Sequence, residues 1–146
     1  PIGGGGLISG VATVVKSLAP SVRVIGAEPS LVDDAARSKA SGSIQPHRGD
    51  PTGTIADGLR TTLGERTFPI IEKLVDEIVT VEEDAIRAAL RLVLERSKLV
   101  IEPSAAVGVA VAVDPTFRDR GHRRVGVVLC GGNLDLVALP GLLPGA

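Results

Sequence analysis

The chain has 146 residues, of which 44% are apolar but only 1% aromatic, and its net charge is −1 with acidic and basic residues interspersed. Such a chain can bury the core of one domain, and its charge gives no reason to expect a nucleic-acid or anionic-membrane partner. A single cysteine, Cys130, excludes a disulfide framework and a cysteine-rich zinc site within the chain. No apolar stretch reaches the ~20 residues that span a bilayer, and no secretory signal opens the chain, so we expect a cytoplasmic protein.

A run of four glycines, Gly3 to Gly6, stands directly before an apolar helical pattern that begins at Leu7. Glycines let the backbone approach a ligand closely, and a loop that opens a helix turns several N–H groups toward one point, where the helix dipole favours an anion. We therefore predict a phosphate cradle. A flexible linker is the alternative. No Gly-Lys-Ser/Thr follows, which excludes a Walker loop, and the dinucleotide fingerprint fits only loosely, although Glu28 lies roughly 20 residues on.

Strands and helices alternate along the rest of the chain. Apolar runs predict strands at 22–27, 77–81 and 124–129, the last being the best strand pattern in the sequence. Helical patterns occupy 7–15, 33–38, 68–74, 83–95 and 105–112. Thr80 and Glu83 have the spacing of a capping box for the fourth of these helices. This alternation predicts an α/β fold, a parallel sheet flanked by helices.

Ligands in parallel sheets bind outside the carboxyl ends of the strands. The glycine loop, Glu28 and the turn at Cys130 all follow or adjoin such ends, so we expect them to share one site. The long stretch 41–58 is rich in Gly, Ser, Pro and Asp, and a connection of this length is usually functional.

Five short motifs occur in order: Gly-Gly-Gly-Gly-Leu at 3–7, Ala-Glu-Pro-Ser at 27–30, Thr-Ile-Ala-Asp-Gly at 54–58, Ile-Glu-Pro-Ser-Ala-Ala at 101–106 and Leu-Cys-Gly-Gly-Asn-Leu-Asp at 129–135. Together they resemble the C-terminal half of the serine racemase / serine–threonine dehydratase family. That family uses pyridoxal 5′-phosphate (PLP) in the fold-type-II, tryptophan synthase β-like architecture. Each motif is weak alone, but the ordered set is specific.

The resemblance implies that Gly3, Gly4, Gly5, Gly6 and Leu7 bind the PLP phosphate through main-chain N–H groups. It also implies that Cys130 faces the pyridine nitrogen, a position that usually holds Ser in the family. A neutral thiol there would leave the ring nitrogen unprotonated. Without the resemblance, Cys130 could equally be a small core residue.

A divalent cation site is implied at Glu28 and Asp34, with the Val32 carbonyl as a third ligand. Carboxylate and carbonyl oxygens suit Mg²⁺ or Ca²⁺. The alternative is that the acidic residues at 33–34 are only helix N-terminal charges.

Further positions follow from the same resemblance. Lys98 and Asn133 match positions that bind ATP, an effector, in eukaryotic-type racemases. Asp57, Gly58 and Glu102 match residues that line the cofactor and substrate cleft, although Glu102 could also be an ordinary first-turn carboxylate.

The family's Schiff-base lysine lies in a Ser-x-Lys-x-Arg-Gly-like motif, which this sequence lacks. We therefore expect residues 1–146 to be the C-terminal part of the enzyme, with the strand that leads into the glycine loop missing. The implied activity is racemisation of L-serine or L-threonine, or β-elimination of water to a 2-oxo acid and ammonia, in a homodimer. The alternative is a truncated, non-catalytic relative that binds phosphate compounds.

Overall fold

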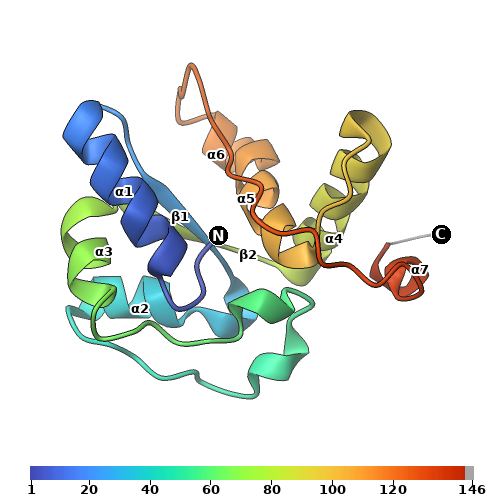
Figure 1. Ribbon diagram of the computed structural model, residues 1–146, viewed down its shortest axis with the longest axis horizontal. Helices are drawn as coiled ribbons and strands as arrows, with labels where there is room; N and C mark the ends of the chain where they lie inside the picture. The colour runs from blue at the N-terminus through green and yellow to red at the C-terminus, as the bar shows by residue number, and fades with distance from the viewer. Residues whose placement is uncertain (144–146) are drawn as a thin grey trace.

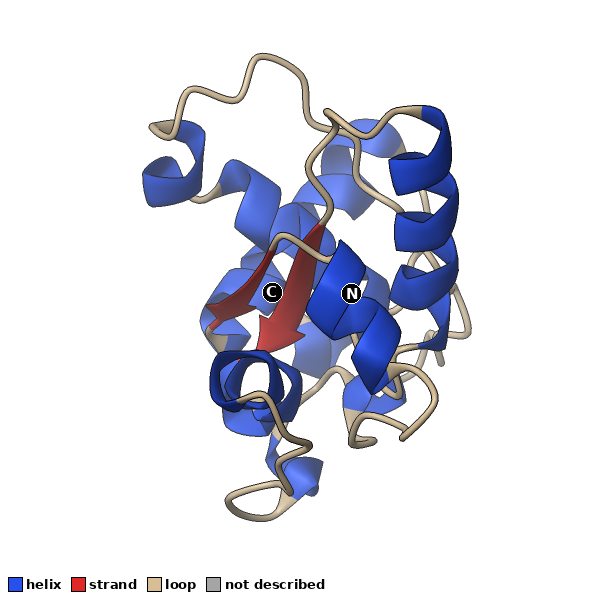
Figure 2. Cartoon of the chain, turned by 90° about the vertical axis from the view of Figure 1, so that its left-hand side faces the viewer, coloured by secondary structure: helices blue, strands red, loops and turns tan. Residues whose placement is uncertain are grey.

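The computed structural model describes residues 1–143 and has a parallel sheet of two strands at its centre, β1 (Ile25–Pro29) and β2 (Glu77–Val81) (Figure 2). Their register pairs Ile25 with Glu77 and continues without a break to the last residues of both strands. Parallel neighbours require a long crossover, and two α-helices and three short 3₁₀ turns lie between these strands in the sequence. The predicted α/β fold with a parallel sheet is confirmed.

Helices cover both faces of the sheet (Figure 1). On one face lie α1 (Gly6–Leu18), α2 (Asp34–Ser41) and α3 (Phe68–Leu74), whose apolar residues form one buried cluster. On the other face lie α4 (Glu83–Leu92) and α5 (Pro103–Val113), which form the second cluster. The sheet lies between the two cores, so both faces of β1 and β2 are covered.

Alternation along the strands distributes their side chains between the two cores. Ala27 and Val79 pack with α4 and α5, whereas Ile78 packs with the helices of the opposite face. Gly26 also faces α1, and a Cβ there would collide with the side chain of Ile2. Helix α1 and the residues before it therefore pack directly on the strand backbone.

The predicted strand 22–27 begins later than expected, at Ile25. Val24 is held at its start by Asp76, because its N–H donates to Asp76 Oδ2 at 2.7 Å and its carbonyl accepts the Asp76 N–H at 2.9 Å. The parallel pairing of the two strands starts at Ile25, opposite Glu77, the first residue of β2. The apolar pattern predicts which residues are buried, whereas the residues of β2 determine where β1 begins.

The predicted helices are all present, but the capping box is wrong. Glu82 is the N-cap of α4 and forms no side-chain cap bond, whereas Glu83 Oε2 accepts the Ile55 N–H at 2.8 Å. Helix α4 continues into a π-helical turn that ends where Lys98 adopts a φ of 57°. The remaining helical segments are short: η1 (Ser30–Val32), η2 (Pro51–Gly53), η3 (Asp57–Leu59), η4 (Val93–Ser97, the π turn), α6 (Pro115–Arg118) and α7 (Leu139–Leu142).

Residues 124–129, predicted as the best strand, are not a strand. The segment runs past α5 (Figure 1), and its backbone finds no hydrogen-bonding neighbour among residues 1–143. Val127 packs against Gly108 of α5, but Val125 and Val128 are about half exposed. A cavity of about 730 Å³ separates the segment from β1 and α1. A strand needs a paired neighbour, which the apolar pattern cannot supply.

No helix within residues 1–143 is both long and apolar enough to cross a membrane.

Candidate cofactor site

The glycine loop ends at Gly5, the N-cap of α1. Gly5 has a φ of 85°, in the left-handed region that favours glycine. Ser9 donates the first helical hydrogen bond, to the Gly5 carbonyl at 3.0 Å. The preceding N–H groups, those of Gly6, Leu7 and Ile8, have no acceptor within the described part of the chain. These unpartnered donors and the helix dipole together favour an anion at this point.

The segment before α3 supports the loop. The Gly4 carbonyl accepts the Thr67 hydroxyl at 2.7 Å and the Gly64 N–H at 3.3 Å. A Cβ on Gly5 would lie 2.7 Å from Ile71 Cδ1 and 2.8 Å from Thr67 Oγ1. No other residue fits at position 5 without displacing these side chains.

A cavity of about 230 Å³ opens at the glycine loop. Its walls bring together the glycine loop and the Cys130 turn, which the sequence predicted to share a site, and also residues 58–59 and Ser104. The lining residues include Gly3, Gly4, Gly5, Gly6, Leu7, Glu102 and Cys130. Cys130 is exposed, which excludes the interpretation of it as a core residue. The cavity therefore combines N–H donors at one wall with a thiol and a carboxylate at the others.

Glu102 holds the turn that carries Cys130. Its N–H donates to the Gly131 carbonyl at 3.3 Å, and its Oε2 accepts the Asn133 N–H at 3.0 Å. Gly131 has a φ of 109°, and a Cβ there would collide with the Glu102 carboxylate. Glu102 is thus more than a first-turn carboxylate of α5, because it fixes the shape of the turn beside the cavity.

Ser104 links this wall to the loop at 57–59. Its Oγ accepts the Gly58 N–H at 3.0 Å. Neither Ser104 nor Thr67 was predicted as a site residue. Both act through tertiary hydrogen bonds to glycine backbone, and a contact of this kind leaves no periodic signal in the sequence.

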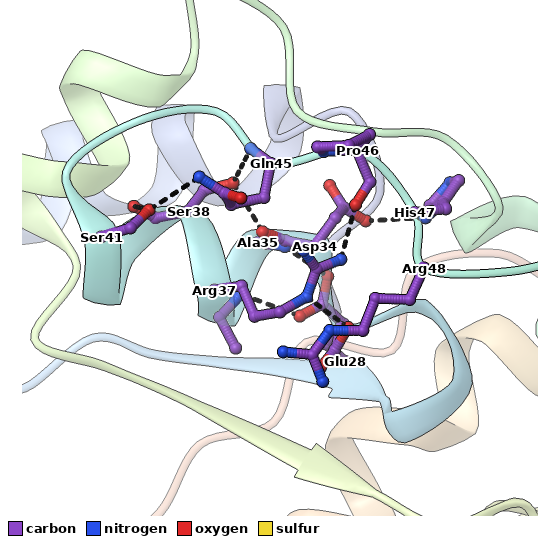
Figure 3. A network of polar contacts seen from close by, with 12 residues as sticks. Glu28, Asp34, Ala35, Arg37, Ser38, Ser41, Gln45, Pro46, His47 and Arg48 are labelled. Atoms are coloured by element: carbon purple, nitrogen blue, oxygen red, sulfur yellow. Dashed lines mark hydrogen bonds and ion pairs between the residues drawn. The ribbon is translucent and has the colours of Figure 1, made fainter.

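The predicted cation ligands lie around the start of α2 (Figure 3). Glu28 does not line the cavity, so the prediction that it shares one site with the glycine loop and Cys130 is wrong. Glu28 is 2% exposed and Asp34 is 1% exposed. The Glu28 oxygens accept the N–H groups of Ala35 and Ala36 at 2.9 and 3.0 Å. Asp34 Oδ2 accepts the Leu63 N–H at 3.1 Å. Glu28 thus caps α2 from the end of β1, which the sequence did not predict.

Burial dominates the electrostatics of both carboxyls. Desolvation raises the pKa of Glu28 to about 8, although the Ala35 and Ala36 N–H groups oppose the shift. Desolvation also raises the pKa of Asp34, against the Leu63 N–H and the nearby His47. Neither carboxylate forms an ion pair with Lys or Arg within residues 1–143. Two buried carboxyls that form no ion pair with Lys or Arg are a donor set that suits a divalent cation.

Val32, the third predicted ligand, is buried beside them at 1% exposure. No group of three or more His, Cys, Asp or Glu side chains in the described residues is arranged to hold a metal. A cation here would therefore rely on two carboxylates, the Val32 carbonyl and water.

His47 was missed by the sequence analysis. Its Nδ1 lies 3.3 Å from Asp34 Oδ1 (Figure 3). Its Nε2 lies 3.0 Å from the Arg60 carbonyl oxygen. It comes from the long stretch 41–58, whose functional role stays a prediction.

The two residues matched to an ATP site have other contacts. Lys98 Nζ donates to the Glu95 carbonyl at 2.6 Å, and the Asn133 backbone binds Glu102. Neither residue lines the cavity at the glycine loop.

Comparison with known proteins gives a consistent result. The family described as "Pyridoxal-phosphate dependent enzyme" matches residues 1–131. A serine racemase of Dictyostelium discoideum is 46% identical over 144 residues, which cover 98% of this chain and 44% of that protein. The solved structure of maize serine racemase superimposes with a TM-score of 0.89 at 43% identity, covering 97% of this chain and 44% of that chain. A crystal structure of threonine deaminase from T.th. gives a TM-score of 0.87 at 46% identity, over 92% of this chain and 48% of that one. The chain thus spans less than half the length of these relatives.

Proposed function

The chain belongs to the pyridoxal-phosphate-dependent enzymes, and from this premise we propose that it forms part of an enzyme acting on L-serine or L-threonine. The proposed reaction is racemisation, β-elimination of water to a 2-oxo acid and ammonia, or both. One observation carries the proposal: a single cavity is lined by Cys130, by Glu102 and by the helix-start residues whose N–H groups have no acceptor in the described part of the chain. The names of the relatives, serine racemase and threonine deaminase, support the substrate class.

The residues present fit PLP. The phosphate would be held by the N–H groups of the glycine loop and of Leu7, and Gly5 leaves no room for a side chain in the loop. Cys130 would face the ring nitrogen with a neutral thiol. When bound, PLP supplies an electron sink for charge that develops at the α-carbon of the substrate.

Each wall of the cavity has a separate task in this proposal. The N–H donors orient the cofactor by its phosphate without needing a lysine or arginine. Glu102 keeps the Gly131 turn in place and so sets where the Cys130 thiol points. The Ser104 bond to Gly58 ties together two further residues that line the cavity.

A second candidate function has an observation in its favour. None of the four lysines, Lys16, Lys39, Lys73 and Lys98, lines the cavity, so residues 1–146 offer no covalent anchor for the cofactor. A non-catalytic relative that binds phosphate compounds would use the same glycine loop. The proposal therefore assigns this chain the phosphate and ring-nitrogen contacts but no catalytic lysine.

We also propose a Mg²⁺ or Ca²⁺ site at Glu28, Asp34 and the Val32 carbonyl, which is supported by the burial of two carboxyls that form no ion pair with Lys or Arg. ATP binding at Lys98 and Asn133 and a homodimeric enzyme are further proposals. They have only the family resemblance behind them, and sedimentation with and without ATP would test both.

The decisive experiment compares two variants of the cavity. Gly5→Asp forces the glycine loop to shift, because its Cβ would collide with Ile71 and Thr67, and it adds a negative charge beside the N–H groups that would hold a phosphate. Cys130→Ser exchanges a thiol for a near-isosteric hydroxyl. We expect Gly5→Asp to weaken PLP binding by at least a hundredfold and Cys130→Ser by less than tenfold, measured as Kd by calorimetry. Equal Kd values for the two variants would contradict the assignment of the phosphate site to the glycine loop.

A further inference from the structure

We propose that Thr67 is the positioning residue of the phosphate cradle, because its hydroxyl fixes the Gly4–Gly5 peptide with the Gly5 N–H turned toward the cavity. This inference rests on the proposed function, since it assumes that the cavity takes a phosphate group.

Two donors converge on a single carbonyl. The Thr67 hydroxyl and the Gly64 N–H both bind the Gly4 carbonyl oxygen, at 2.7 and 3.3 Å. Thr67 Oγ1 in turn accepts the Gly64 N–H at 3.2 Å. The Gly64 carbonyl is a second acceptor within reach of the Thr67 hydroxyl, at 3.0 Å, but the Gly4 carbonyl is the nearer one. The Gly4 carbonyl is therefore oriented by two donors from the segment before α3.

That orientation determines where the next N–H points. The chain has no cis peptide bond in its described part, and the carbonyl and N–H of a trans peptide point in opposite directions. Gly4 and Gly5 line the cavity, whereas Thr67 and Gly64 do not. A carbonyl drawn toward Thr67 thus turns the Gly5 N–H toward the cavity.

Thr67 does not cap the helix that it precedes. It occupies the N-cap position of α3, where a threonine side chain normally accepts a hydrogen bond from the helix start, yet it forms no side-chain cap bond there. Its hydroxyl instead reaches a residue 63 positions away. The same side chain closes the space beside Gly5, where a Cβ would lie 2.8 Å from its oxygen. Thr67 thus both orients the loop and excludes a side chain from it.

The test separates phosphate binding from ring binding by comparing PLP with pyridoxal, which lacks the phosphate. In the purified protein we expect Thr67→Val to weaken PLP binding about tenfold and to change the Kd of pyridoxal less than twofold. Thr67→Ser, which keeps the hydroxyl, should restore PLP binding to within threefold of wild type. Thr62→Val is the matched control, because Thr62 is exposed and its hydroxyl forms no hydrogen bond with the described residues.

The outcomes distinguish this inference from the proposed function. A wild-type protein that binds pyridoxal as tightly as PLP would refute the phosphate cradle itself. If wild type prefers PLP and Thr67→Val keeps the full preference, the cradle stands and the role of Thr67 is overturned. An equal loss for both ligands would also overturn it, since a merely structural role predicts that result.

A measurement on wild type covers the case in which Thr67→Val does not fold. The Gly5 amide signal in a ¹H–¹⁵N spectrum should shift on addition of PLP and not on addition of pyridoxal. If the Gly6 and Leu7 amide signals shift on addition of PLP and the Gly5 signal does not, the assigned orientation of the Gly5 N–H is overturned.

Discussion

Glu28 and Asp34 are carboxyls that the fold removes from water, and backbone N–H groups replace only part of the lost hydration. The Glu28 oxygens bind two N–H groups at the start of α2, where the helix dipole also favours negative charge. Even so, burial dominates and favours the protonated acid. At the residue scale, these buried carboxyls make the stability of the folded state depend on pH.

The pH dependence has a definite sign. The pKa of Glu28 rises from 4.5 to about 8 on folding, so the folded state holds more protons than the unfolded state between these values. In EDTA we therefore expect the free energy of unfolding to fall as the pH rises from 5 to 8, by at most about 1.4 kcal/mol per pH unit from this group. Urea unfolding at pH 5, 6, 7 and 8 measures it. Glu28→Gln should flatten the slope, and an unchanged slope in that variant would assign it to other groups.

A divalent cation should act on the same pair. At a hundredfold excess over its Kd, a bound ion adds about 2.7 kcal/mol to the stability of the folded state. We expect Mg²⁺ to raise the Tm of wild type, and Asp34→Ala to lose most of that rise. Thermal melts in EDTA and in excess Mg²⁺ give the comparison. An equal response in both proteins would show that these carboxyls are only helix-start charges.

At the element scale, the contact between α1 and β1 depends on a missing side chain. Gly26 brings the residues before α1 against the strand backbone, and a methyl group there would meet Ile2 and Ile8. Ile2 is 1% exposed, so its side chain is enclosed by its neighbours. The packing of this layer is thus set by one strand glycine.

Two alanine substitutions should therefore have opposite signs. Gly26→Ala overpacks a buried contact, and we expect a loss of about 1–3 kcal/mol in the free energy of unfolding. Gly10→Ala lies within α1 with no atom near its Cβ, so helix propensity should add up to about 1 kcal/mol. Chemical denaturation of both variants measures the difference. A Gly26→Ala variant as stable as Gly10→Ala would contradict the close packing.

The elements themselves were largely predictable, because their local signals agree with their tertiary surroundings. Phe68–Leu74 and Glu77–Val81 have the bounds that the patterns predict. The sequence misled at 124–129, where β-branched residues predict a strand whose partner is absent from residues 1–143. The sequence also gave no signal for Thr67 or His47, because their contacts with Gly4 and Asp34 form only in the folded chain.

At the scale of the whole molecule, the sequence predicts which segments line the proposed site. It does not predict the hydrogen bonds that hold those segments in place. The glycine loop and Cys130 line one cavity as expected. Glycine motifs predict a close approach of backbone and ligand, whereas the supports from Glu102, Ser104 and Thr67 depend on how the layers stack. The roles assigned to Gly3–Leu7, Cys130 and the cation ligands remain predictions.

The placement of the lysines gives a prediction for the chain of 146 residues. Because no lysine lines the cavity, borohydride reduction in the presence of PLP should leave no stoichiometric phosphopyridoxyl group on any one lysine. Mass spectrometry of tryptic peptides measures this. A full adduct at a single lysine, lost in its Lys→Ala variant, would contradict the prediction and place a covalent anchor in the chain.

The cavity of about 730 Å³ between β1 and residues 124–129 affects how the protein behaves in concentrated solution. Beyond one bond from the Ile2 N–H to the Ala27 carbonyl, the outer edge of β1 has no ladder partner in residues 1–143, and Val125 and Val128 stand exposed across from it. Unpaired edges of this kind recruit strands from other molecules and lead to aggregation. A net charge of −1 and an isoelectric point near 6.2 provide little mutual repulsion between molecules at neutral pH. Colloidal stability in concentrated solution will therefore depend on keeping the pH well away from 6.2.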